Sequence, residues 1–267
     1  MKTIIYYFTG TGNSLAAAKK IAAVLEECEL IPIATLQNTT GDITPQADRV
    51  GIINPVYFAG LPVMVAGFAG RLDLSKAKYV FSVVTFGGSG AAPALQQLDS
   101  ILKKRRDYGL DAGFMVKMPG NYILLYESPT GEKREKILAT ADAQVVDIAG
   151  AVKRSEPRKL PSSLLFSLLH SIAYPHFTSH VHEDDRKFSV NENCTSCGIC
   201  AAICPAGNIE LVDGKPVWKH HCELCCGCIH LCPTEAIQAG SRTAARQRYH
   251  NPSVRIEDLK GLREKIF

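Results

Sequence analysis

The sequence predicts an α/β protein in which a doubly wound, five-stranded parallel sheet is followed by a small α+β domain rich in cysteine. Apolar, β-branched runs alternate with helical segments through the first 155 residues, a pattern typical of a parallel sheet with helices on both faces. A glycine-rich loop follows the first apolar run directly. Nine of the ten cysteines lie between Cys194 and Cys232, so the 267-residue chain divides into two unlike parts.

The strands of the sheet are expected at short apolar runs rich in β-branched residues. These runs are residues 2–8, 30–33, 49–54, 78–85 and 110–118. Helices are expected between them, at residues 15–22, 61–71, 92–106 and 132–154. Ligands bind outside the carboxyl ends of parallel strands, so the loops after the first, third and fourth strands form the candidate site.

The loop after the first strand has the composition of an anion-binding turn. It consists of Thr9, Gly10, Thr11, Gly12, Asn13 and Ser14. Glycines let the backbone fold closely around a phosphate, and backbone N–H groups, hydroxyls and the helix amino terminus supply donors. The loop lacks the lysine of a P-loop and the third glycine of a dinucleotide fingerprint. An ordinary strand-to-helix turn capped by Asn13 or Ser14 is the alternative.

Two further loops complete a resemblance to flavodoxin. Residues 9–14 resemble its FMN-phosphate loop, and residues 55–60 and 85–90 resemble its two isoalloxazine loops. The resemblance implies that an aromatic side chain flanks the flavin ring, while small residues offer backbone groups to its polar edge. The implied residues are Pro55, Tyr57, Phe58, Ala59, Gly60, Thr85, Phe86, Gly87 and Gly88. The aromatic residues could instead belong to the core.

A long aromatic stretch at residues 119–129 departs from a plain flavodoxin. Long ordered loops in compact domains are usually functional. We therefore expect this stretch, including Asn121 and Tyr122, to cover the flavin or to form a seat for the cysteine-rich domain. A position on the far face of the sheet would contradict this expectation.

Eight cysteines form two copies of the pattern C-x2-C-x2-C-x3-C-P, which is the ligand set for two 4Fe-4S clusters. In this pattern the fourth cysteine of each copy reaches the other cluster. The spacing assigns one cluster to Cys194, Cys197, Cys200 and Cys232, and the other to Cys222, Cys225, Cys228 and Cys204. Zinc needs no third cysteine at this spacing, and disulfides persist mainly in oxidising compartments. Cys226 is expected to be a non-ligand.

Residues 188–240 resemble a two-cluster bacterial ferredoxin, with a hairpin expected at residues 208–212 and 215–218. Trp218 is expected to pack under the clusters. The whole chain looks like the flavodoxin-ferredoxin fusion proteins of anaerobes. The implied organisation is an FMN-binding domain at residues 1–155, a helical linker at 156–187, the cluster domain at 188–240 and a basic tail at 241–267.

The linker contains an apolar segment at residues 162–174, which is too short to span a bilayer as a helix. Packing between domains or across a homodimer is the favoured interpretation, and an interfacial membrane helix is the alternative. The histidines nearby are expected in an exposed connector rather than in a metal site. Those beside the second cysteine motif are expected at the surface, and tuning of a cluster by hydrogen bonding or proton coupling is the alternative. They are His176, His180, His182, His220, His221 and His230.

Charge is unevenly distributed along the chain, whose formal net charge is +4. Residues 188–240 carry two lysines against five acidic residues, whereas residues 241–267 carry seven basic residues against three acidic ones. We expect the basic tail to be solvated or paired within the chain, because no nucleic-acid motif accompanies it. The absence of a secretory signal and of a transmembrane segment predicts a cytoplasmic protein.

The combination of a flavin site and two clusters predicts an electron-transfer protein that serves a partner oxidoreductase. A flavin exchanges two electrons or one, while a cluster passes one at a time. An FMN-dependent reductase acting directly on a small acceptor is the alternative, although no catalytic acid, dyad or nicotinamide fingerprint is recognisable. A DNA-binding regulator is disfavoured, because no recognition helix is present.

Overall fold

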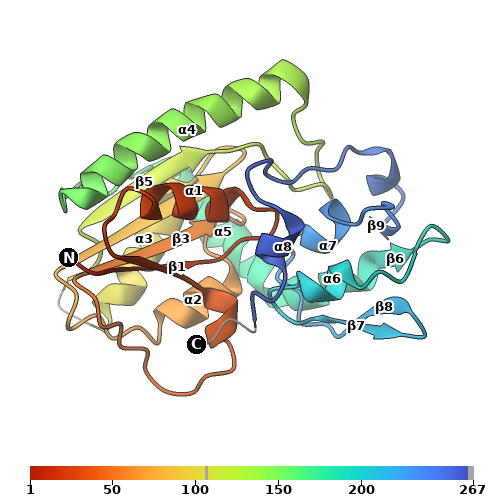
Figure 1. Ribbon diagram of the computed structural model, residues 1–267, viewed down its shortest axis with the longest axis horizontal. Coiled ribbons are helices and arrows are strands. Elements are labelled where there is room, and N and C mark those ends of the chain that lie inside the picture. The colour runs from red at the N-terminus through yellow and green to blue at the C-terminus, as the bar shows by residue number, and fades with distance from the viewer. Residues whose placement is uncertain (106–107, 264–267) are drawn as a thin grey trace.

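The computed structural model describes residues 1–105 and 108–263. Its main sheet has five parallel strands in the order β2-β1-β3-β4-β5 (Figure 1). The strands are β1 (Thr3–Tyr7), β2 (Cys28–Pro32), β3 (Arg49–Pro55), β4 (Tyr79–Phe86) and β5 (Ala112–Lys117). This order is that of a flavodoxin-like doubly wound sheet, so the predicted fold class of the first part is confirmed.

The central strands are buried almost throughout. Every residue of β1 is buried, and so is every residue but the last in β3 and β4. Such continuous burial is expected of parallel strands covered on both faces, which explains why their sequences read as unbroken apolar runs. Each strand begins and ends within two residues of its predicted bounds.

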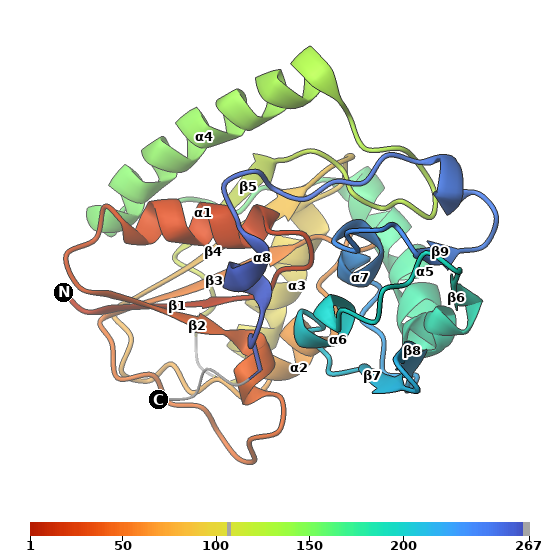
Figure 2. The ribbon, with the colours of Figure 1, turned by 45° about the vertical axis from the view of Figure 1, so that its right-hand side comes forward.

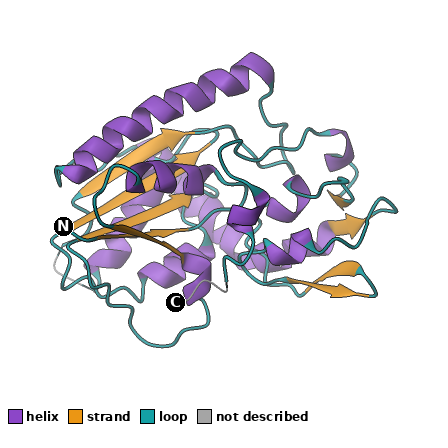
Figure 3. Cartoon of the chain, viewed as in Figure 1, coloured by secondary structure: helices purple, strands orange, loops and turns teal. Residues whose placement is uncertain are grey.

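Helices form a layer on each side of the sheet (Figure 3). α1 (Asn13–Ala22) and α4 (Gly131–Lys153) pack together on one face, and α2 (Val63–Ala69) and α3 (Ala92–Lys103) pack together on the other. The second and third helices are shorter than predicted, and residue 106 lies outside the described residues. A short 3-10 turn, η1 (Ile33–Leu36), follows β2.

The cysteine-rich part is built from short elements beside the carboxyl end of the sheet (Figure 1). β6 (Phe188–Val190) pairs antiparallel with β9 (Ile237–Ala239), and β7 (Ile209–Val212) pairs antiparallel with β8 (Lys215–Trp218). Two one-turn helices, α6 (Ile199–Ala202) and α7 (Gly227–His230), contact each other. The predicted hairpin is confirmed, and its turn residues Asp213 and Gly214 both have positive φ.

The expected exposed connector is only partly exposed: His176 is exposed, whereas Asp184 and Asp185 are buried. α5 (Leu164–His180) continues through Pro175, and the 3-10 helix η2 (Val181–Lys187) follows it. Asp185 is 1% exposed, and the cost of burying its carboxylate is offset by hydrogen bonds from Asn208 Nδ2 at 2.7 Å and from His220 Nδ1 at 2.5 Å. Residues 181–187 therefore help to hold the cysteine-rich part in place. Their charged sequence did not indicate this role.

The segment after residue 240 folds back onto the sheet domain, so it is paired within the chain through its buried residues, while much of its other side stays exposed. It contains η3 (Thr243–Ala245) and α8 (Ile256–Leu259). Val254, Leu259 and Leu262 are at most 3% exposed and belong to the main core. Residues 264–267 lie outside the described residues. Within residues 1–105 and 108–263, no helix combines the length and apolar character needed to cross a bilayer.

Candidate functional site

A cavity of about 450 Å³ lies at the carboxyl end of the sheet. Its walls come from the loops after β1, β3 and β4, from residues 119–126, from α5 and from residues 224–226. The volume falls within the range of small-molecule and cofactor sites. The cavity is thus where a doubly wound sheet is expected to bind its ligand.

Most of the residues predicted to bind FMN line this cavity. They are Thr9, Gly10, Thr11, Asn13, Ser14, Pro55, Tyr57, Phe58, Ala59, Thr85, Phe86, Gly87, Gly88, Asn121 and Tyr122. Two predicted glycines have packing roles instead. Gly12 has φ +96°, and a Cβ there would lie 3.0 Å from Val254 Cβ, while a Cβ at Gly60 would lie 2.3 Å from the Tyr174 ring.

The hydroxyls of the loop after β1 are positioned by hydrogen bonds. Thr9 Oγ1 accepts from the Gly12 N–H at 3.1 Å, and Thr11 Oγ1 accepts from Asn121 Nδ2 at 2.6 Å. Each of these hydroxyls retains its own hydrogen for donation to a ligand. Among the described residues that line the cavity, none is lysine or arginine. An anion there would be held by hydroxyls and backbone N–H groups.

Asn13 has a different role from the one expected, because its side chain is committed to the protein. Asn13 Nδ2 donates to Pro119 O at 3.2 Å, and Asn13 Oδ1 accepts from Tyr249 OH at 2.7 Å and from Asn251 Nδ2 at 3.1 Å. Asn251 also donates its backbone N–H to Thr11 O at 2.8 Å. The C-terminal segment therefore holds the loop in place, and we call these hydrogen bonds to Asn13 the clamp. At the start of α1, Asn13 can offer a ligand its backbone N–H.

Aromatic side chains form another wall of the cavity. Phe58 stacks on Phe177 with ring centroids 4.6 Å apart and meets Tyr122 edge-on at 5.6 Å. Sequence reasoning missed Phe177, because its helix was expected to end earlier. Burial raises the pKa of Tyr122 to about 12.

The stretch after β5 lies at the cavity and not on the far face of the sheet. It contributes Pro119, Leu125 and Tyr126 to the lining, besides the predicted Asn121 and Tyr122. Two glycines allow this approach. A Cβ at Gly87 would lie 2.3 Å from Gly120 Cα, and a Cβ at Gly120 would lie 2.8 Å from the Tyr126 ring.

The eight motif cysteines surround two separate spaces. One is lined by Cys194, Cys197, Cys200 and Cys232, and the other by Cys204, Cys222, Cys225 and Cys228. Each set combines three cysteines of one motif with the fourth cysteine of the other motif. This is the grouping that the spacing predicts. Cluster binding by these cysteines remains a prediction. In the described part of the chain, no three His, Cys, Asp or Glu side chains are placed to hold a single metal ion. A cubane is larger than an ion, so its thiolates stand further apart.

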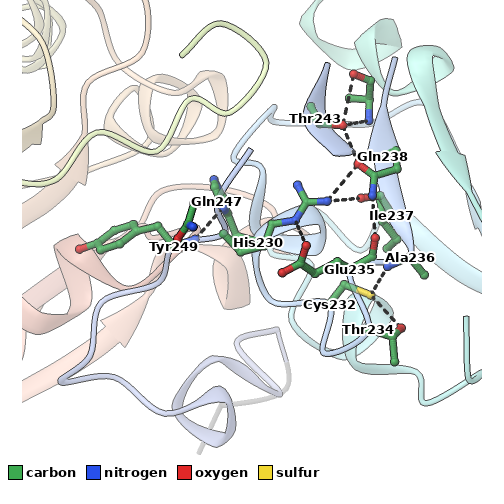
Figure 4. Close-up of polar contacts among 12 residues, drawn as sticks. His230, Cys232, Thr234, Glu235, Ala236, Ile237, Gln238, Thr243, Gln247 and Tyr249 are labelled. Atoms are coloured by element: carbon green, nitrogen blue, oxygen red, sulfur yellow. Dashed lines mark hydrogen bonds and ion pairs between the residues drawn. The ribbon is translucent and has the colours of Figure 1, made fainter. Parts of the chain in front are cut away.

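Backbone N–H groups point at several of these sulfurs. Cys232 Sγ accepts from the Ala236 N–H at 3.2 Å (Figure 4), and Cys204 Sγ accepts from the Asn208 N–H at 3.3 Å. The two contacts have the same spacing in the two motifs, and such hydrogen bonds tune cluster potentials. Burial raises the pKa of Cys225 to about 12, so a free thiol there is neutral. Metal binding at this position would require loss of the thiol proton.

The large cavity and the second cysteine space share a wall. Cys225 and Cys226 line both of them. The loop after β1 reaches this wall directly, because a Cβ at Gly10 would lie 2.7 Å from Cys225 O, and a Cβ at Gly227 would lie 3.0 Å from Gly10 O. Close backbone contact, which the sequence did not indicate, is thus the reason for glycine at both positions.

His230 joins the cysteine-rich part to the cavity and is not at the surface, contrary to expectation. It is 3% exposed, and its Nδ1 accepts from the Tyr249 N–H at 3.0 Å (Figure 4). Nε2 must then carry the hydrogen that it donates to Asn121 O at 2.7 Å. Burial lowers the pKa of His230 to about 4, which keeps the ring neutral. A chain of hydrogen bonds therefore runs from α7 through Asn121 to Thr11.

Glu223 anchors the cysteine-rich part to α2. Glu223 is 4% exposed, and its carboxylate accepts a hydrogen bond from the Met64 N–H at 3.1 Å. Burial raises the pKa of Glu223 to about 7. The residue lies between Cys222 and Cys225, so this contact fixes the second motif against the sheet domain.

No family model and no curated protein matches the chain. Several solved structures are similar to its first part. A flavodoxin of Fusobacterium nucleatum with bound flavin mononucleotide is 14% identical with a TM-score of 0.38, covering 59% of this chain and 100% of its own. A flavoprotein of Bacteroides uniformis is 18% identical with a TM-score of 0.35, covering 52% and 96%. An azoreductase of Bacillus anthracis is 11% identical with a TM-score of 0.39, covering 56% and 99%.

Proposed function

We propose that this chain is an electron-transfer protein that relays electrons between FMN and two 4Fe-4S clusters and serves a partner oxidoreductase. The observation that carries the proposal is the shared wall of Cys225 and Cys226, which separates the large cavity from the second cysteine space. Two redox groups on either side of such a wall would be close enough to exchange electrons without a mobile carrier.

The cavity suits FMN in the kinds of group it presents. Thr9, Thr11 and the N–H groups at the start of α1 would hold the phosphate, and Tyr57, Phe58 and Phe86 would flank the ring. When bound, FMN supplies a centre that exchanges one or two electrons, whereas each cluster passes one. The chain would then convert between a two-electron couple and single-electron carriers.

Exposure of the cysteines suggests where the relay meets its partner. Cys197 of the first set is exposed, whereas the second set holds no exposed cysteine and adjoins the cavity. The second cluster would therefore exchange electrons with the flavin, and the first cluster with the partner protein. The predicted division into an FMN-binding domain and a cluster domain belongs to the same proposal, as does a cytoplasmic location.

An FMN-dependent reductase of a small acceptor is the second candidate. The observation in its favour is the exposure of cavity residues, because Leu125 is 67% and Phe58 is 42% exposed. A small acceptor could reach the flavin from that side without any partner protein.

Anaerobic purification with quantification of iron, sulfide and flavin tests the proposal. We expect about eight irons, about eight sulfides and one FMN per chain. Cys225→Ser should lower the iron content, whereas Cys226→Ser, which alters the adjacent non-ligand position, should leave it unchanged. Four irons in the unaltered chain, or no bound flavin, would contradict the proposal. Reoxidation of the reduced protein by a small acceptor alone would favour the reductase.

A further inference from the structure

One face of α5 is apolar and uncovered in the single chain. Leu164 is 93% exposed, Leu165 72%, Leu168 63%, Leu169 50% and Ile172 69%. The helix lies at the side of the molecule near the cysteine-rich part (Figure 2). Leu165, Leu168, Leu169 and Ile172 recur at the spacing of one helix face, and we call them the α5 stripe.

The opposite face of α5 is packed against the sheet domain, so the helix cannot bury the stripe by rotating. A Cβ at Gly90 would lie 2.7 Å from the Phe166 ring, and Tyr174 packs equally closely on Gly60. Ser167 Oγ hydrogen bonds Gln96 Oε1 of α3 at 3.1 Å. The stripe is therefore held outward by contacts on its other side.

The exposed apolar area is as large as the largest patches found on soluble monomers, and patches of that size are often functional. Together with Leu164, the stripe presents on the order of 600 Å² of apolar surface, the upper end of what soluble monomers leave uncovered. Each partner in a standard protein interface buries roughly 800 Å². The stripe could thus supply most of one side of a stable interface.

The spacing of the stripe is the same in both directions along the helix. Its members lie three, one and three residues apart, so the centre falls between Leu168 and Leu169. A two-fold axis at that point would pair two antiparallel α5 helices, with Leu165 against Ile172 of the partner subunit. A self-complementary patch of this kind is what an isologous dimer requires.

Charge also favours a second copy over a lipid surface. α5 contains no Lys, Arg, Asp or Glu, so two copies can meet without like charges facing each other across the axis. Interfacial membrane helices are typically rich in Lys and Arg on their polar face, which α5 lacks.

We propose that the α5 stripe is a homodimer interface, in which α5 of one copy packs antiparallel on α5 of a second copy. Leu169 lines the large cavity as well as belonging to the stripe. The second copy would therefore cover the cavity beside Leu169 and slow the release of its ligand. This last step rests on the proposed function, whereas the dimer does not.

Sedimentation velocity over a range of protein concentrations tests the interface. We expect the unaltered chain to have twice the 29.0 kDa mass of one chain. Leu168→Glu places two carboxylates beside the axis and should raise the dimer dissociation constant by about 100-fold. The matched control is Val146→Glu on α4, where Val146 is 62% exposed, and it should leave the dimer intact. Leu168→Ser serves as a milder variant if the glutamate variant does not fold.

Three outcomes would overturn the dimer: a monomer at every concentration, equal dissociation by Val146→Glu, or stripe-dependent binding to phosphatidylcholine–phosphatidylglycerol vesicles. The rate of FMN release is measured separately on the same variants. Faster release from Leu168→Glu is expected, and an unchanged rate would remove the covering role alone. A dimer that binds no FMN would overturn the proposed function and leave the interface standing.

Discussion

At the scale of single residues, the candidate site depends on side chains that never touch the cavity. Tyr249 and Asn251 are each 2% exposed and hold Asn13 Oδ1 from behind. Their hydrogen bonds hold the turn whose N–H groups would bind the phosphate of FMN under the proposed function. Affinity for FMN should therefore depend on the C-terminal segment as well as on the loop itself.

Tyr249→Phe removes one hydrogen bond to Asn13 and should weaken FMN binding by roughly three- to tenfold, because one such bond contributes about 1 kcal/mol. Tyr79→Phe is the matched control. Tyr79 OH donates to Glu156 O at 2.8 Å at the amino end of β4, away from the cavity, so its loss should lower stability but not affinity. Flavin fluorescence titration measures the dissociation constant, and urea unfolding measures the stability. Equal effects of the two variants on affinity would contradict the clamp.

At the scale of elements, the C-terminal segment is held on α1 by the hydrogen bonds to Asn13 and by an ion pair from α8. Lys19 Nζ lies 2.9 Å from Asp258 Oδ2, and the side chain of Asp258 is 19% exposed. The hydrogen bond from Lys19 lowers the pKa of Asp258 below its usual 3.8. The pKa of Asp258 is lower in the folded state than in the unfolded state. Its contribution to the free energy of unfolding is therefore complete above pH 3.8 and is lost as the pH falls through the folded pKa.

Asp258→Asn should therefore reduce the free energy of unfolding at pH 7 by less than about 1 kcal/mol, as is usual for partly exposed pairs. The difference from the unaltered chain should shrink at pH 3, where Asp258 is becoming protonated. Glu257→Gln on the same helix is the control, because Glu257 is mostly exposed and lies 3.7 Å from Lys260. Urea unfolding at both pH values provides the measurement. If Asp258→Asn lowered the free energy of unfolding equally at pH 7 and pH 3, the ion pair with Lys19 would not be the cause of its effect.

At the scale of the whole molecule, the two parts of the chain share their interior. Ile203 and Leu231, which lie beside the cysteine motifs, belong to the same buried cluster as the sheet. Ile123 and Phe177 belong instead to the cluster that surrounds the cysteines. Apolar contacts therefore cross the boundary in both directions, together with the His230 and Glu223 anchors.

If the second cysteine set holds a cluster, as proposed, loss of that cluster should weaken flavin binding, because Gly10 contacts the backbone of Cys225. In an anaerobic thermal melt, cluster absorbance and bound-flavin circular dichroism should change at the same temperature. Cys225→Ser should release FMN at a lower temperature than Cys28→Ser, which alters a cysteine outside the motifs. Separate transitions in the unaltered chain would show that the two parts unfold independently.

The sequence alone determined the parallel sheet, the position of the candidate site and the grouping of the cysteines. These features depend on local patterns: runs such as residues 2–8, the loop at residues 9–14 and fixed spacings between cysteines. Such patterns can be recognised from neighbouring residues alone, without knowing which distant segments pack against them. Only the tertiary structure decided the burial of His230, the clamp on Asn13 and the wall at Cys225. Each of these features depends on a contact between residues about 100 or more positions apart. A local sequence pattern does not indicate which distant segment will make such a contact.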